Sequence, residues 1–154
     1  MKKTVVALVL VIMTLFAGTA FAVDEIAETA PAQKEIDVFV NGKALEMDVA
    51  PVIVNDRTMV PMRAIFEALG ARVNWIDTDR LIVATEGDTI IIMQIENEKM
   101  IIDKAVEGEK KTVILDSVPF IMNDRTLVPA RAVSEALEAN VAWDADTRTV
   151  TVTK

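Results

Sequence analysis

The 154-residue chain contains no cysteine, no histidine and no tyrosine. Without cysteine no disulfide can form, so the stability of the fold has to come from packing. Without histidine and cysteine the usual zinc and copper ligands are missing, and the two serines, Ser117 and Ser134, lack a histidine base. These absences argue against thiol, zinc and serine–histidine chemistry.

Basic residues are scarce relative to acidic ones. The chain has 16 lysines and arginines against 24 aspartates and glutamates, which gives a net charge of −8. Such a surface repels nucleic-acid phosphates and anionic membranes, and no basic stripe offsets the repulsion. We therefore expect no nucleic-acid partner.

The first 22 residues have the pattern of a secretory signal peptide. Lys2 and Lys3 precede the apolar stretch Thr4–Phe16, which is short for a bilayer span, and the small residues Ala20 and Ala22 suit a cleavage site. The alternative is an uncleaved membrane anchor. We expect cleavage after residue 22, no membrane association afterwards and a net charge of −10. The acidic, aperiodic residues 23–35 are expected to form a disordered leader.

A ten-residue motif occurs twice in the remaining chain. Asn55–Ala64 (NDRTMVPMRA) returns 68 residues later as Asn123–Ala132 (NDRTLVPARA). The wider segments 51–85 and 119–153, called here the first and the second copy, agree at 18 of 35 aligned positions. Such repetition indicates a duplicated supersecondary unit, in which neither copy buries its apolar face alone.

Each copy is predicted to contain a polar turn, a short helix and a β-hairpin. In the first copy Pro61 suits the first turn of a helix over residues 62–69, and Gly70 suits its end. The second helix is expected over residues 130–138. Because Glu138 aligns with Gly70, we expect this helix to end less cleanly or to continue to Asn140.

Further strands are predicted outside the helix–hairpin units. Asn41-Gly42 suits a hairpin turn between residues 36–40 and 44–49, and apolar segments follow at 89–95, 99–103 and 112–115. The run Thr89–Met93 suggests a strand that is buried on both faces. We expect eight to ten short strands and two short helices in one α+β domain, residues 36–154. Its sheet is expected to be mainly antiparallel, and the domain to be built from two fused helix–hairpin repeats.

The repeated Asn-Asp-Arg-Thr-x-Val-Pro-x-Arg-Ala, with Glu-Ala-Leu and Val-x-Trp behind it, resembles the copper amine oxidase-like N-terminal domain, also called the stalk domain. The likeness covers residues 36–153. It implies a secreted or surface-attached bacterial module. The copper and quinone chemistry of those oxidases belongs to a different domain, which needs histidine ligands and a modifiable tyrosine. Since this chain has neither residue type, we expect no enzyme activity and no cofactor.

Ten of the residues that recur in both copies are the candidate site residues: Asn55, Asp56, Arg57, Arg63, Trp75, Asn123, Asp124, Arg125, Arg131 and Trp143. Arg63 and Arg131 could clamp an anionic ligand, but we expect each to pair with an acidic residue of its own copy. The expected partner is the glutamate four residues further along the helix (Glu67 or Glu135) or the aspartate of the motif's turn (Asp56 or Asp124). Trp75 and Trp143 could stack on carbohydrate, but their alternating strands favour the core. The ten residues are therefore interpreted as a structural motif.

Acidic residues suggest two further kinds of site. Asp77 and Asp79, like Asp144 and Asp146, place two carboxylates one residue apart in a predicted turn, as a calcium loop does. The glycine and glutamate positions of an EF-hand loop are not matched, so we expect ordinary Asx turns and no metal. A carboxylate pair could also serve a glycosidase, but few aromatic residues are available to line a sugar cleft.

The sequence thus favours an exported, non-catalytic module of the cell surface or the extracellular space. We expect it to serve as a binding, adhesion or spacer domain, with a cell-envelope protein or a wall polymer as its partner. One alternative is a small secreted enzyme or metal-binding protein with an unrecognised carboxylate site. Another is a module that forms homodimers through an apolar patch on one face.

Overall fold

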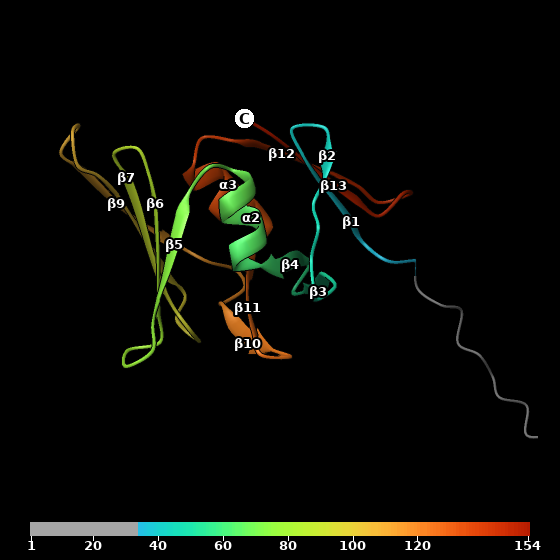
Figure 1. Ribbon diagram of the computed structural model, residues 1–154, viewed down its shortest axis with the longest axis horizontal. Coiled ribbons are helices and arrows are strands. Elements are labelled where there is room, and N and C mark those ends of the chain that lie inside the picture. The colour runs from blue at the N-terminus through green and yellow to red at the C-terminus, as the bar shows by residue number, and fades with distance from the viewer. Residues whose placement is uncertain (1–33) are drawn as a thin grey trace, which may run out of the picture. The chain divides into compact units, whose positions relative to one another are not determined.

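The computed structural model describes residues 34–154 (Figure 1). The expected signal peptide and residues 23–33 of the expected leader lie outside the described residues. Lys34 and Glu35, the last two leader residues, are exposed and belong to no helix or strand. No helix within residues 34–154 is long and apolar enough to cross a membrane.

The described residues form three β-sheets and two short helices (Figure 1). The first sheet has the strand order β12 (Asn140–Asp144), β13 (Thr149–Thr153), β1 (Asp37–Val40), β2 (Lys43–Ala44). The second has the order β10 (Phe120–Met122), β11 (Arg125–Pro129), β4 (Arg57–Pro61), β3 (Val52–Val54). The third has the order β5 (Arg72–Ile76), β6 (Leu81–Glu86), β7 (Thr89–Gln94), β8 (Lys99–Lys104), β9 (Glu109–Ile114).

All neighbouring strands are antiparallel except β1 and β13, which run parallel. The predicted α+β class with a mainly antiparallel sheet is therefore confirmed. The expected number of strands was too low, because segments of two or three residues such as β2, β3 and β10 also pair. A strand that short has no readable period and forms only through its neighbour.

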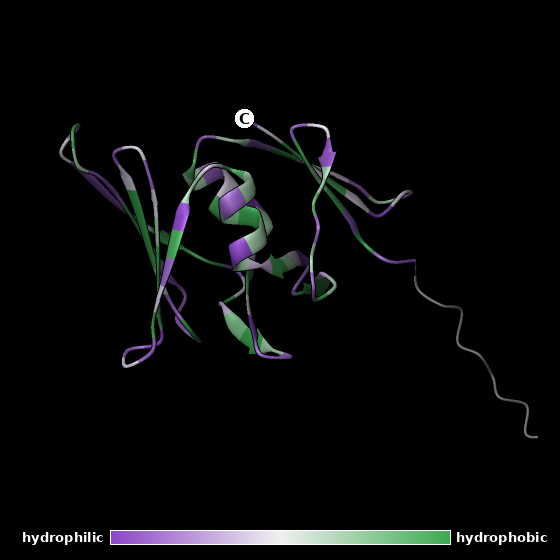
Figure 2. Cartoon of the chain, viewed as in Figure 1, coloured by the Kyte–Doolittle hydropathy of each residue, from purple (hydrophilic) through white to green (hydrophobic). Residues whose placement is uncertain are grey.

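Helices α2 (Met62–Ala68) and α3 (Ala130–Ala136) contact each other, and each also contacts the first strand of the hairpin that follows it. Figure 1 shows both helices between the first and the third sheet. The core around them is apolar, and Ile65, Phe66 and Val133 have no exposed surface. The first part of β5 alternates between hydrophilic and hydrophobic residues (Figure 2), and along the whole strand exposed residues alternate with half-buried ones, as a strand with one covered face requires.

The strands that carry the two motifs meet at the centre of the second sheet. Val60 of β4 lies opposite Val128 of β11, and these two residues are aligned with each other in the repeat. Both are fully buried. After each of these two strands the chain continues in the same order, with a helix and then a β-hairpin. The two copies therefore share one core instead of each burying its own.

The second helix does not end as expected. Glu138 adopts the left-handed conformation (φ 61°), as Gly70 does at the equivalent position (φ 85°), so α3 ends at Ala136 just as α2 ends at Ala68. The expected continuation to Asn140 was wrong, whereas the end is less regular than that of α2: the amide of Leu137 donates only to Ser134 O (3.1 Å), and the amide of Leu69 donates to Ile65 O as well as Phe66 O. A left-handed glutamate is strained, and its carboxylate lies 2.5 Å from the Nζ of Lys104.

Three strand predictions also need correction. In β7, Ile91 and Met93 are buried, but Ile90 and Ile92 on the opposite face are only half-buried, so the strand is not covered on both faces. The strand expected over residues 112–115 begins earlier, because β9 spans Glu109–Ile114. The strand expected over residues 44–49 is reduced to β2.

Candidate functional site

The asparagine and aspartate of the repeated motif form two-residue hairpin turns. Asn55 and Asp56 connect β3 to β4 with φ values of 50° and 58°, and Asn123 and Asp124 connect β10 to β11 with φ values of 49° and 57°. Two successive left-handed residues define a turn whose twist matches that of the flanking strands, and Asn and Asp tolerate this conformation best. This explains why the motif begins with Asn-Asp.

The first arginine of each motif pairs with an aspartate that precedes the other copy. Arg57 donates to the carboxylate of Asp116 from Nη2 and, at 3.0 Å, from Nε. Arg125 donates to the carboxylate of Asp48 from Nε alone, and Asp48 and Asp116 are also 68 residues apart. All four side chains are partly exposed, so each pair contributes at most about 1 kcal/mol. Their importance lies in joining the two copies reciprocally.

The second arginine of each motif behaves differently. Arg63 and Arg131 are exposed, and neither takes part in an ion pair within residues 34–154. The expected pairing with a glutamate or with the turn aspartate of the same copy is wrong. On a helix, an arginine four residues before a glutamate has the less favourable orientation of that pair. Both guanidinium groups are therefore available to an external ligand.

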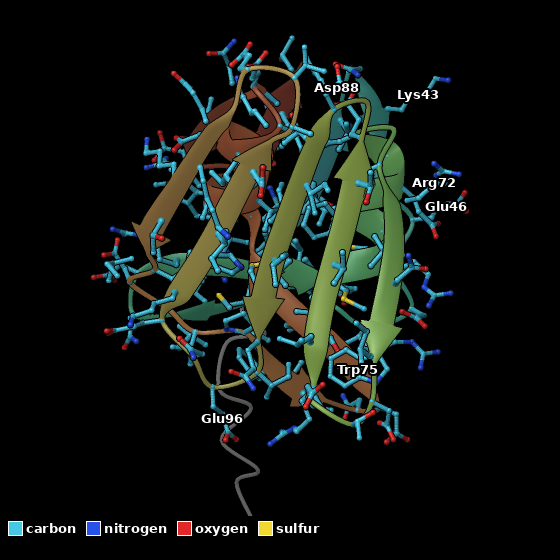
Figure 3. All side chains as sticks on the ribbon, turned by 90° about the vertical axis from the view of Figure 1, so that its left-hand side faces the viewer. Lys43, Glu46, Arg72, Trp75, Asp88 and Glu96 are labelled. Carbon is cyan, nitrogen blue, oxygen red and sulfur yellow. The ribbon has the colours of Figure 1, made fainter. Side chains whose placement is uncertain are left out.

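The two tryptophans are less buried than expected. Trp75 on β5 is half-buried and packs against the core, with its Nε1 3.3 Å from Oδ1 of Asp77 (Trp75 is labelled in Figure 3). Trp143 on β12 is 37% exposed, so its assignment to the core is wrong. The residue equivalent to Asp77 in the second copy is Ala145, which cannot accept a hydrogen bond from the indole.

Both copies contribute to each of two surface grooves. Groove A, with a volume of about 980 Å³, combines Arg63 and Trp75 of the first copy with the strand and turn residues Ile121, Asp124 and Arg125 of the second. Groove B, about 320 Å³, combines the equivalent residues Arg131, Trp143, Ile53, Asp56 and Arg57. Eight of the ten residues that line groove B are equivalent to residues of groove A.

The grooves differ in charge. Groove A also contains four further carboxylates, those of Glu46, Asp48, Glu67 and Asp77, and is acidic as a whole. In groove B, Asp56 is the one acidic residue among the lining residues, against Arg57 and Arg131. Groove B therefore suits an anionic group, and groove A suits a neutral or cationic one.

Exposed isoleucines at the grooves were not predicted from the sequence. Ile53 is 43% exposed and Ile121 is 46% exposed, and each lies on an edge strand of the second sheet. In each groove the exposed isoleucine lines the same surface as a tryptophan, and two such apolar side chains can form a platform for a ligand. The signal was present, because the two isoleucines are identical residues at aligned positions. Asp48 and Asp116 carried the same signal three residues before the aligned copies.

One of the two aspartate-rich turns, that of Asp144 and Asp146, holds its own backbone. The carboxylate of Asp144 accepts hydrogen bonds from the amides of Asp146 (2.9 Å) and Thr147 (3.1 Å), as an Asx turn does. The bonds from Thr147 and Asp146 lower the pKa of Asp144. In the described part of the chain, no three His, Cys, Asp or Glu side chains are grouped so as to hold a metal ion.

Comparison with known proteins places this arrangement in a family. Residues 39–152 match the family model of the copper amine oxidase N-terminal domain, as the repeated motif predicted. A curated protein from Brevibacillus choshinensis, named "Protease inhibitor", is 26% identical over 138 residues. The match covers 90% of this chain but 40% of that relative, so the chain spans less than half of its length. The chain belongs to the copper amine oxidase N-terminal domain family.

Proposed function

We propose that this chain is an exported, non-catalytic module that binds a polymer of the bacterial cell wall through grooves A and B. The observation that carries the proposal is an arginine without an ion pair beside a partly exposed tryptophan, in two grooves of the same construction. A sugar ring can stack on the indole, and a guanidinium group can donate to its carboxylate, phosphate or hydroxyl oxygens.

The charges of the grooves favour a polymer that carries groups of both signs. The basic groove B would take a carboxylate, and the acidic groove A would take an amine or a neutral sugar. Peptidoglycan has this chemistry, since its glycan is linked to short peptides that bear carboxylates and amines. Two weak sites on one rigid domain also raise the overall affinity for a polymer that reaches both.

We also propose that the domain arose as two fused helix–hairpin repeats. Its support is the pairing of Val60 with Val128 on aligned positions and the reciprocal ion pairs that cross between the copies. In this view the ten recurring residues have two roles. The Asn-Asp-Arg part of the motif builds the turn and joins the copies, and the later arginine and the tryptophan face the ligand.

The proposal is tested by titrating the purified chain with soluble peptidoglycan fragments, with a neutral glucan as the comparison. Trp75 and Trp143 are the only tryptophans, so intrinsic fluorescence reports on the two grooves alone. We expect quenching by peptidoglycan, and we expect Arg131→Gln and Trp143→Ala to weaken binding by about tenfold or more. The matched control is Arg72→Gln, an exposed arginine that lines neither groove. Unchanged fluorescence, or an equal effect of the control, would overturn the proposal.

The name of the Brevibacillus choshinensis relative favours a second candidate, the binding of a protease. In that case a segment of the protease would occupy a groove in place of a glycan. The discriminating measurement is the activity of a secreted bacterial serine protease titrated with the chain. A stoichiometric loss of activity that Arg131→Gln abolishes would replace the polymer by a protease.

A further inference from the structure

The third sheet has an uncovered face. Its inner face packs into the core, where Ile82, Ala84 and Ile91 have no exposed surface. Its opposite face, called here the outer face, points away from the helices. Figure 3 shows this face from the front, and no helix or strand of the described residues lies before it. An antiparallel sheet that packs on one side normally presents polar side chains to water on the other.

The outer face is instead apolar at its centre. The strand register places five residues side by side in its middle row, Asn74, Val83, Ile92, Ile101 and Thr112. The three central side chains of this row are branched, apolar and only half-buried.

The rows on either side of the middle row extend the apolar area. Leu81 and Ile90 flank it and are half-buried, and Ile76 and Ile114 at the two edge strands are 40% and 57% exposed. Seven branched aliphatic side chains thus form one patch on a single sheet face. A contiguous apolar patch of this kind typically marks an interaction surface.

We propose that a second copy of this chain covers the outer face, so that the protein forms a two-fold dimer by packing sheet against sheet. Five strands about 4.8 Å apart and six residues about 3.4 Å apart give a flat footprint of roughly 480 Å². Side chains on a pleated face expose more area than the footprint, so two copies together bury more than about 1,000 Å². That reaches the size expected of a specific interface.

The charges on the outer face differ from those of the chain as a whole. The chain is acidic overall, with a net charge of −8. On the outer face, however, Arg72, Lys99 and Lys110 outnumber Asp103, which shares their side of the register. The outer face therefore carries a small net positive charge, unlike the chain as a whole. Neither Lys99 nor Asp103 has an ion-pair partner among the described residues.

One orientation of the two-fold axis pairs these charges. If the axis runs across the strands along the middle row, Ile92 and Ile101 each face their own equivalent in the second copy. Lys99 and Asp103 lie two residues to either side of Ile101 on β8. The same axis therefore places Asp103 of each copy opposite the partner's Lys99, and the dimer gains two ion pairs. Sheets that pack face to face rotate by about 30°, which moves β8 little because β8 adjoins the central strand.

The proposal is tested by measuring the mass of the chain in solution by analytical ultracentrifugation over a concentration series. The chain is purified with the N-terminal processing that its host carries out. We expect a dimer, and we expect Ile92→Lys to raise the dissociation constant roughly a hundredfold or more. The matched control is Thr151→Lys, which places a lysine on an exposed position of β13 in a different sheet. Circular dichroism checks that both variants fold.

A charge exchange then tests the orientation of the axis. Asp103→Lys alone and Lys99→Asp alone each place like charges opposite one another and should give monomers. An equimolar mixture of the two variants restores both ion pairs and should give a heterodimer. A monomeric parent chain at high micromolar concentration would overturn the proposal, and it would leave the face to an acidic partner protein or to another segment of the chain. A dimer that survives Ile92→Lys, or a mixture that stays monomeric, would also overturn it.

Discussion

At the scale of single residues, the backbone conformation explains part of what recurs in the two copies. Positions 55, 56, 123 and 124 are left-handed, and they carry Asn-Asp in both motifs. The helix ends are also left-handed in both copies, but there the residues differ, glycine at position 70 and glutamate at position 138. Glycine adopts this conformation without a steric penalty, whereas a glutamate has to be held in it.

The helix ends give the first prediction. Gly70→Ala should destabilise the fold by about 1 kcal/mol, because alanine is strained in the left-handed conformation. Glu138→Gly removes this strain and gives up an exposed ion pair with Lys104, which contributes little. We therefore expect the two variants to shift the melting temperature in opposite directions, down for Gly70→Ala and up for Glu138→Gly. A lower melting temperature in both variants would mean that the ion pair between Lys104 and Glu138 stabilises the fold by more than the left-handed backbone of Glu138 destabilises it.

At the scale of elements, the sequence was sufficient for the helices, for their order and for the hairpins behind them. Pro61 and Gly70 bracket α2, and alternation in residues 72–76 identifies β5. The groove could not be predicted, because each copy supplies its helix to one groove and its turn to the other. Such crossing depends on the pairing of β4 with β11, and pairing between distant strands leaves no local pattern in a sequence.

The hairpin of β12 and β13 gives the second prediction. The pKa of Asp144 is lowered by hydrogen bonds that exist only in the folded chain. A carboxyl group with a lowered folded pKa stabilises the fold above its unfolded pKa, and this contribution is lost as the pH falls through the folded pKa. Asp144→Asn should therefore melt lower than the parent at pH 7, and the difference should disappear in acid. The control is Asp146→Asn, because the Asp146 carboxylate accepts no hydrogen bond within residues 34–154. A difference that is constant from pH 7 to pH 2 would contradict the assignment.

At the scale of the whole domain, the chain is closed by contacts between its distant parts. The parallel pairing of β1 with β13 joins the beginning of the described chain to its end. The pairing of β4 with β11 joins the two motifs, and the pairing of β6 with β7 attaches the strands that lie between the copies. One apolar core contains buried residues from both copies. Each of these three pairings joins a strand before residue 88 to a strand after it, so separating the chain into two fragments at residue 88 would remove all three.

The last prediction follows from these pairings. We expect residues 36–87 and residues 89–154, expressed separately, to be unfolded, because each fragment retains open strand edges and half of a core. The intact chain should melt in a single transition, with hydrogen-exchange protection that extends across β4 and β11 together. Mixing the two fragments is the control, since the broken pairings can re-form between them and should restore protection. Two fragments that each fold alone and melt near the temperature of the parent would show two independent modules. Each groove needs residues from both copies. In that case separating the fragments would abolish both grooves although each fragment stays folded.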